Sequence, residues 1–200
     1  MQNKTATEKF LVFAIILSMF IWGIGWPSNK VLAGYGSPVN LVVYRYIIVV
    51  ISLLPILFFL KASFKIKKEG IPLVLFAGFI FAVYSYCFIK GLKHGFAGAG
   101  GVLVTTLNPI MAYAIGLSLN RKRPSVNEAI GLTLGLIAGC VLLNIRGNLG
   151  SIFSAGNLYF LSAAFLWTIV SKSTSKGTTY GSSLGFSLWM YLVALCCLLP

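Results

Sequence analysis

Acidic residues are almost absent from this sequence. Its 200 residues include only 3 acids, all of them glutamate, and charged residues of both signs make up 10% of the chain. A soluble domain has about a quarter charged residues. Because 58% of the residues are hydrophobic, the chain cannot cover a water-facing surface with polar groups. The composition therefore indicates a membrane protein.

Groups for catalysis and metal binding are also scarce. His94 is the only histidine, and the 4 cysteines Cys87, Cys140, Cys196 and Cys197 lie in apolar runs without CxxC spacing. A cysteine in such a run behaves as a small hydrophobe. No Ser-His-Asp set, HExxH, phosphate loop or paired carboxylate is present in the sequence. We expect no disulfide, metal site, cofactor or enzymatic activity.

The net charge of +13 would suggest nucleic-acid binding in a soluble protein. Here the basic residues fall almost entirely in short loops between apolar runs, which is the pattern of membrane insertion, so we expect no nucleic-acid partner. With the N-terminus inside, eleven of the 16 Lys and Arg residues lie in cytoplasmic segments and three lie outside. The bias predicts a multi-pass membrane protein with a cytoplasmic N-terminus.

Seven apolar runs are long enough to be membrane spans, since a spanning helix needs about 20 such residues. The first is too long for a signal peptide and is followed by no small-residue cleavage site, so we expect an uncleaved span. The predicted spans are 10–33, 39–60, 71–90, 97–119, 127–145, 156–172 and 182–200.

The sequence repeats itself weakly at an offset of 145 residues. Trp22 matches Trp167, Tyr46 matches Tyr191, and the "YGS" at 35–37 recurs at 180–182. Five spans separate the copies, so the second copy must enter the membrane upside down. An all-α bundle of inverted repeats is typical of secondary transporters.

The second copy is shorter than the first. Residues 1–147 are predicted to form a first five-span repeat, and residues 148–200 to begin a second. The chain stops at Pro200, which matches Pro55 inside the second span. We expect a truncated sequence whose complete form has three more spans.

The stretch "FIWGIGWPSNK" places polar groups on one face of the first span. Trp22, Trp26 and then Asn29 or Lys30 follow helical spacing, and Pro27 removes a backbone hydrogen bond, which favours a hinge. These side chains either line a substrate cavity or are interfacial tryptophans beside a snorkelling lysine.

Arg45 lies about 10 Å into the second span at 1.5 Å per residue, where an arginine costs at least about 2.5 kcal/mol. It either faces a cavity or is a structural arginine bound to carbonyls, and Tyr44 and Tyr46 beside it can hydrogen-bond in both cases. No span contains a carboxylate deep inside it. Together with Lys30, Arg45 therefore makes a positive field that suits a carboxylate-bearing solute.

Thr105 and Asn108 share a face of the fourth span, beside Pro109. They indicate either a substrate-facing bend, with Pro109 as a second hinge, or a packing kink satisfied by nearby side chains. Tyr84 in the third span is a further candidate for substrate contact.

Gly131, Gly135 and Gly139 form a GxxxGxxxG ladder in the fifth span. Such a face packs closely against another helix. The partner is either a helix of the same chain or a second copy in a homodimer.

Several segments together resemble the EamA-like proteins of the drug/metabolite transporter superfamily. They are "WGIGWPSNKVL", "SPVNLVVYRYIIVVISLLP", "GLKHGFAGAGGVLVTTLNPIMAYAIG", "AIGLTLGLIAGCVLL" and "GNLYFLSAAFLWTIVSK". The resemblance implies ten spans in two inverted five-helix repeats around a central cavity, and export of amino acids, metabolites or toxic compounds across the bacterial inner membrane. One departure is Lys122 in the fourth-to-fifth loop, where family members often have a glutamate.

The leading hypothesis is a secondary carrier that exports small polar metabolites, most readily amino acids or related carboxylates, by alternating access. The partners are then a small-molecule substrate and the lipid bilayer. The alternatives are a multidrug or toxic-compound exporter, and a membrane fragment without transport activity.

Overall fold

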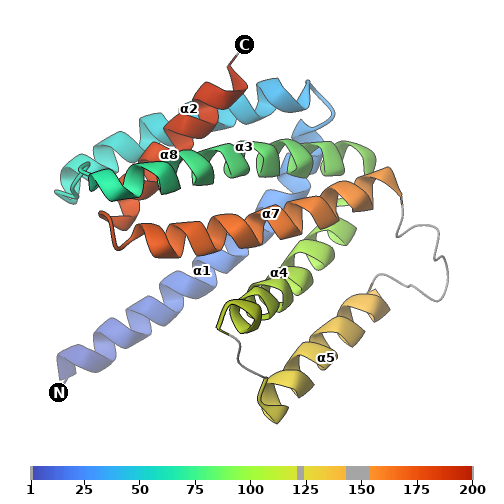
Figure 1. Ribbon diagram of the computed structural model, residues 1–200. Coiled ribbons are helices and arrows are strands. Elements are labelled where there is room, and N and C mark those ends of the chain that lie inside the picture. Colours follow the sequence, from blue (N-terminus) through green and yellow to red (C-terminus); the bar gives the residue numbers. More distant parts are fainter. Residues whose placement is uncertain (1, 121–123, 143–153, 200) are drawn as a thin grey trace.

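The computed structural model describes residues 2–120, 124–142 and 154–199, and these residues are helical at every predicted span (Figure 1). The all-α prediction is confirmed. Residues 143–145 of the fifth predicted span lie outside the described residues. The helices are α1 (Gln2–Leu32), α2 (Pro38–Phe59), α3 (Ile71–His94), α4 (Ala97–Asn120), α5 (Val126–Leu142), α7 (Ala155–Gly177) and α8 (Ser183–Leu198), with a short 3₁₀ turn η1 (Lys68–Gly70) before α3.

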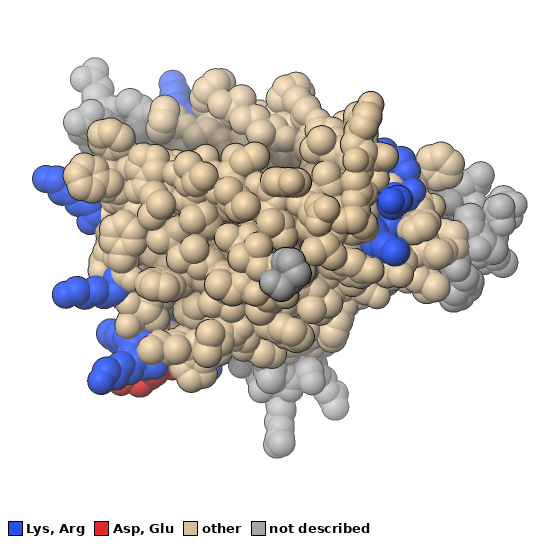
Figure 2. Space-filling model, turned by 90° about the horizontal axis from the view of Figure 1, so that it is seen from above, with Lys and Arg blue, Asp and Glu red and all other residues tan. Residues whose placement is uncertain are grey.

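Four of the described segments are long and apolar enough to cross a membrane: Glu8–Leu32, Pro38–Phe59, Lys68–His94 and Ala97–Leu117. α5 and α8 are apolar but shorter. Figure 2 shows the Lys and Arg side chains gathered toward the ends of the molecule, with an uncharged band between them. The protein is therefore a multi-pass membrane protein.

Two serines start α2 and α8 in the same way. Ser37 precedes α2 with φ −71° and ψ 145°, and its side chain accepts a hydrogen bond from the Asn40 amide. Ser182 precedes α8 with φ −68° and ψ 146° and accepts from the Gly185 amide. A serine at this position satisfies an otherwise unpaired amide of the first turn. Both serines come from the "YGS" sequence that occurs twice in the chain.

α2 ends in a Schellman motif built on a lysine. Lys61 has φ 50°, its amide donates to the Phe58 carbonyl, and the Ala62 amide donates to the Leu57 carbonyl. The left-handed conformation usually requires glycine, so Lys61 is held there by the paired backbone groups around it.

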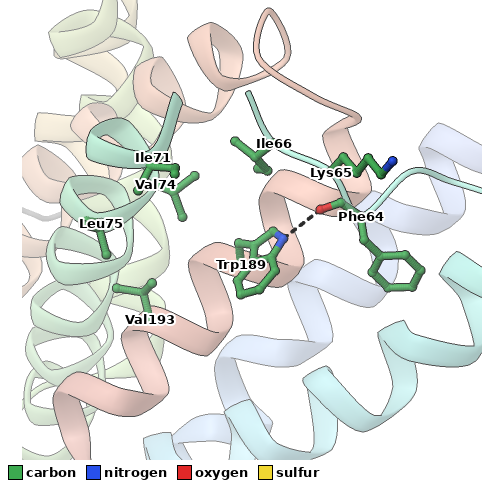
Figure 3. A pocket seen from close by; sticks show the side chains of 8 residues that line it. All are labelled: Phe64, Lys65, Ile66, Ile71, Val74, Leu75, Trp189 and Val193. Carbon is green, nitrogen blue, oxygen red and sulfur yellow. Dashed lines mark hydrogen bonds between the residues drawn. The ribbon is translucent and has the colours of Figure 1, made fainter. Parts of the chain in front are cut away.

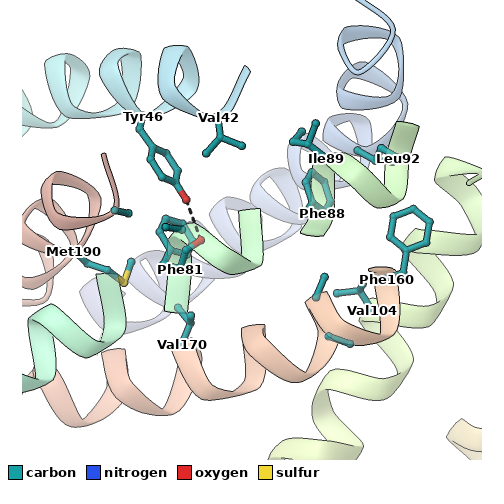
Figure 4. Packing of buried hydrophobic residues seen from close by; sticks show 14 of the residues in the cluster. Val42, Tyr46, Phe81, Phe88, Ile89, Leu92, Val104, Phe160, Val170 and Met190 are labelled. Carbon is teal, nitrogen blue, oxygen red and sulfur yellow. Dashed lines mark hydrogen bonds between the residues drawn. The ribbon is translucent and has the colours of Figure 1, made fainter. Parts of the chain in front are cut away.

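α3 lies at the centre of the bundle, where it packs against α7 and α8 while α8 also packs against α2 (Figure 1). α4 packs on the far side of α7. In the core, the fully buried Tyr46 of α2 turns its hydroxyl toward α3 (Figure 4). That hydroxyl donates to Ser85 Oγ at 2.5 Å and lies 3.1 Å from the Phe81 carbonyl oxygen. The buried hydroxyls of Tyr46 and Ser85 are therefore paired.

Glycines allow α3, α4 and α7 to meet around the fully buried ring of Phe160. A Cβ added at Gly91 would stand 2.7 Å from that ring, and one added at Gly100 would stand 2.5 Å from it. Beside them, a Cβ at Gly156 of α7 would lie 2.6 Å from the Gly95 backbone. The three helices approach this closely because these positions carry no side chain.

The loop after α2 is bound to the loop before α8. Ile66 and Gly181 form an antiparallel bridge, and the Lys67 amide donates to the Tyr180 carbonyl at 2.9 Å. Ser182 Oγ also donates to the Ser63 carbonyl at 2.6 Å. We call residues 63–67 and 180–182 the loop clasp. It ties together two segments that are more than a hundred residues apart in the chain.

Candidate substrate site

An open groove of 520 Å³ lies between α1 and α4. Trp22 and Trp26 face it from α1, and Thr105 faces it from α4. Trp22 is 48% exposed, whereas Trp26 is 8% exposed and belongs to the hydrophobic core. Three of the residues predicted to line a substrate path therefore share one groove. Its full lining is Trp22, Gly23, Trp26, Pro27, Ala97, Gly98, Gly101, Val102 and Thr105.

Aromatic rings continue inward from this groove along α3. Phe81, Tyr84 and Phe88, here called the aromatic ladder, are stacked with centroids 5.8 Å and 6.0 Å apart. Phe88 meets the edge of Trp26 at 5.0 Å, and Tyr84 lies 4.9 Å from Trp167 of α7. Such rings offer an apolar surface with electron-rich faces.

Arg45 adds a positive charge to this aromatic surface. Its guanidinium carbon lies 6.0 Å from the centroid of the Phe88 ring, the distance of a weak cation–π contact. The Arg45 side chain is exposed. It can therefore reach a negatively charged group next to the aromatic ladder.

Lys30, the other predicted cation of the site, is bound to the backbone of α3. Its Nζ donates to the Leu92 carbonyl at 2.6 Å and to the Gly95 carbonyl at 2.7 Å. Cations at a helix C-terminus satisfy carbonyls that have no partner within the helix. Lys30 thus joins the C-terminal end of α1 to the C-terminal end of α3.

Asn108 joins α4 to α7. Its Oδ1 lies 3.0 Å from Thr168 Oγ1, which is also 2.9 Å from the Ala164 carbonyl oxygen. Thr168 is fully buried beside Trp167. Asn108 is therefore placed at the α4–α7 contact, one helical turn beyond Thr105 of the groove.

The remaining predicted contact residues do not meet at one point. The Asn29 side chain donates to the Gly25 carbonyl of its own helix at 2.6 Å, and Tyr44 is 65% exposed on α2. Thr105 Oγ1 bonds its own helix at the Gly101 carbonyl, 2.6 Å away. Of the predicted residues, Trp26, Tyr84 and Arg45 lie against Phe88, and Trp22 and Thr105 share the groove with Trp26.

Both predicted hinge prolines lie within continuous helices, Pro27 in α1 and Pro109 in α4. Near Pro27, Ser28 Oγ donates to the Ile24 carbonyl at 2.9 Å. The carbonyl that lacks an amide partner because of Pro27 is that of Gly23, so this bond does not replace the missing one. Hinge motion at either proline stays a prediction.

Two glycines of the ladder in α5 lie toward α4. A Cβ added at Gly139 would stand 3.0 Å from Thr106, and one at Gly135 would stand 4.0 Å from Ile110. A Cβ at Gly131 would meet nothing within 4 Å. The described contacts of this face are thus with the same chain, and a homodimer through it stays a prediction.

Sequence reasoning missed Phe88, Trp167 and Thr168 as neighbours of the site. The repeat carried a signal for one of them, because Trp167 occupies the position that matches Trp22. Phe88 had no such signal. An aromatic residue in an apolar span is ordinary, and only its contacts with Trp26 and Arg45 distinguish it.

These features define an all-α, multi-pass membrane protein with an aromatic groove between its helices. Residues 9–145 match the model of the EamA-like transporter family. The chain belongs to this family, and it is a membrane transporter of the drug/metabolite type. No curated protein and no solved structure matches the chain.

Proposed function

We propose that this chain is a secondary carrier that exports small carboxylate-bearing metabolites, most readily amino acids, across the bacterial inner membrane by alternating access. The observation that carries this proposal is the exposed Arg45 guanidinium 6.0 Å from the Phe88 ring. It offers a cation next to an apolar surface. A carboxylate would bind Arg45, and the uncharged part of the solute would pack against the aromatic ladder.

The charge of the surroundings supports an anionic group at Arg45. The three glutamates are Glu8, Glu69 and Glu128, and none lies on α2, α3 or α4. Lys30 is engaged by carbonyl oxygens of α3, so we assign the solute's carboxylate to Arg45 alone. The inverted repeat, the cytoplasmic N-terminus and the two-repeat division at 147 belong to the same proposal. The matched caps Ser37 and Ser182 support the repeat.

The test is transport by the purified chain in liposomes. A panel of amino acids is compared with the corresponding amides, which lack the carboxylate charge. We expect saturable flux above empty vesicles for at least one acid, and at least about tenfold weaker apparent affinity for its amide, equivalent to about 1.4 kcal/mol. Arg45→Ala should remove that preference, and Arg45→Lys should keep part of it.

The matched control is Lys90→Gln, since Lys90 is a cation of α3 whose Nζ lies 5.9 Å from the Tyr86 ring. This variant should transport like the wild type. Equal flux of acids and amides, or an unchanged preference in Arg45→Ala, would reject the carboxylate assignment. No flux above empty vesicles would favour the fragment without transport activity.

A multidrug or toxic-compound exporter is the second candidate, and the lining of the groove favours it. Trp22, Trp26 and several small or apolar residues line the groove, and Thr105 is the one hydroxyl-bearing side chain among them. Such a surface also binds flat apolar cations through ring faces. Transport of aromatic cations that is unaffected by Arg45→Ala would support this candidate over the carboxylate carrier.

A further inference from the structure

A second apolar groove lies next to the loop clasp (Figure 3) and shares no lining residue with the groove between α1 and α4. Its volume is 590 Å³, within the roughly 300–1,000 Å³ of small-molecule pockets. It runs between the start of α3 and the middle of α8. The lining residues are Phe64, Lys65, Ile66, Ile71, Val74, Leu75, Trp189 and Val193.

The groove is held open by defined contacts. The indole N–H of Trp189 donates to the Phe64 carbonyl at 2.9 Å (Figure 3), so the polar atom of this side chain is already paired and its ring carbons line the groove. The bridge between Ile66 and Gly181 holds the other edge. Leu75, 53% exposed, stands on the accessible side of the groove, while Val74 is buried within it.

The segment that forms one wall of the groove is strongly basic. Lys65 lines the groove with its ammonium group pointing away from the apolar side chains (Figure 3). Lys61, Lys67 and Lys68 are exposed on the same loop, and Glu69 is its one acid. An anionic lipid has a negatively charged headgroup and apolar acyl chains. The lysines could bind the headgroup, and the apolar groove at the end of the membrane helix could bind an acyl chain.

We propose that this groove binds an anionic phospholipid, with an acyl chain against Ile71, Leu75 and Val193 and the phosphate at the lysines of the adjoining loop. Charge complementarity selects this occupant, because the groove supplies cations at one end and apolar surface along its length. A zwitterionic lipid would use the apolar surface but gain little from the lysines. The site is separate from the groove between α1 and α4, and it does not depend on which solute is carried.

The bound lipid would also act on the loop clasp. Lys65 and Lys67 lie in the same five-residue segment whose backbone pairs with Tyr180 and Gly181. A phosphate at these lysines lowers their mutual repulsion, so it stabilises the clasp. Lipid binding therefore favours the arrangement in which the α2–α3 and α7–α8 loops are joined.

The experiment measures which lipid the purified full chain retains in detergent. Phosphatidylglycerol and phosphatidylcholine with identical acyl chains are supplied in equal amounts, and bound lipid is counted by native mass spectrometry. We expect at least fivefold preference for phosphatidylglycerol. The triple variant K65Q/K67Q/K68Q should abolish the preference, and K65R/K67R/K68R should restore it.

Two further variants separate this site from general attraction of lipid to a basic protein. K90Q/K93Q removes two lysines of the other end of α3 and should leave the preference unchanged, since Lys93 contacts the Gly36 carbonyl and Lys90 the Tyr86 ring. Leu75→Trp fills the accessible side of the groove from an exposed position, so it should lower retention of both lipids.

Four results would overturn the proposal. The first three are equal retention of the two lipids by the wild type, an equal loss of preference in K90Q/K93Q, and full displacement of the lipid by soluble glycerol phosphate. The third result would mean that the lysines bind a phosphate and the groove binds no acyl chain. Unchanged lipid retention in Leu75→Trp would likewise mean that the groove does not bind the acyl chain.

Discussion

Tyr46 and Tyr191 lie edge to face with ring centroids 5.3 Å apart, and they occupy matched positions of the repeated sequence, 145 residues apart. Phe81 of α3 stacks on Tyr46 at 5.3 Å and meets the edge of Tyr191 at 5.0 Å. Equivalent side chains of α2 and α8 thus contact each other directly. This is the arrangement expected where two repeats meet at an axis, and it favours the inverted repeat that we propose.

The Tyr46 hydroxyl should stabilise this contact. Tyr46→Phe leaves the Ser85 hydroxyl, 1% exposed, without its partner. We expect the free energy of unfolding to fall by about 1–3 kcal/mol, the usual cost of a buried unpaired polar group. The loss of stability is measured as a lower melting temperature of the purified chain in detergent. Tyr44→Phe is the control on the exposed side of α2 and should change nothing. Equal melting temperatures for the two variants would contradict the stabilising role of the Tyr46 hydroxyl.

Gly100 should be intolerant of any side chain. Gly100→Ala places a Cβ 2.5 Å from the Phe160 ring, and such overpacking costs about 1–3 kcal/mol. Thermal unfolding in detergent should show this loss, and Phe160→Leu in the same chain should recover part of it. Gly98→Ala is the matched control, because a Cβ there meets nothing within 4 Å. If the two alanine variants unfold at one temperature, the tight packing around Phe160 is refuted.

Lys30 should stabilise the folded protein. Lys30→Met leaves the Leu92 and Gly95 carbonyls without their cation, and hydrogen bonds to charged groups contribute about 1.5–3 kcal/mol. We expect a lower melting temperature for Lys30→Met and a near-normal one for Lys30→Arg, with the apparent affinity for solute unchanged in both. A weakened affinity at wild-type melting temperature would instead show that Lys30 contacts the solute.

Pro27 should set the rate of transport if it is a hinge. Pro27→Ala supplies the missing amide and stabilises a straight α1 by up to about 3 kcal/mol. We expect slower turnover with little change in affinity, measured as flux in liposomes. Pro55→Ala is the control, since Pro55 lies inside α2 and is not a predicted hinge. An unaltered turnover rate in Pro27→Ala would reject the hinge.

The helices could be predicted from the sequence because the length and hydropathy of a single apolar run are enough to identify a membrane span. Their ends were less predictable. α7 continues to Gly177, past the expected end at 172, although its last turns carry Lys176 and several hydroxyl side chains. Hydroxyls of this segment bond carbonyls of their own helix, as Thr174 does with Val170. The polar composition of these turns alone suggested a loop.

The site was only partly predictable because its cations depend on distant partners. Lys30 and Arg45 look alike in sequence, as single cations in apolar spans. The structure separates them: Lys30 donates to two carbonyls of α3, whereas the Arg45 guanidinium lies over the Phe88 ring. The residue spacing within α1 or α2 does not reveal that Lys30 and Arg45 have different partners. It arises from the way α3 lies against both helices.

The contact of Lys30 with α3 also has a consequence for how the protein is made. Its two acceptor carbonyls lie 62 and 65 residues further along the chain, so they do not yet exist when α1 leaves the ribosome. The ammonium group must stay in water or among lipid headgroups until α3 has been inserted. We therefore expect α1 to reach its final depth only after the third helix arrives, which makes these two helices a single unit of assembly.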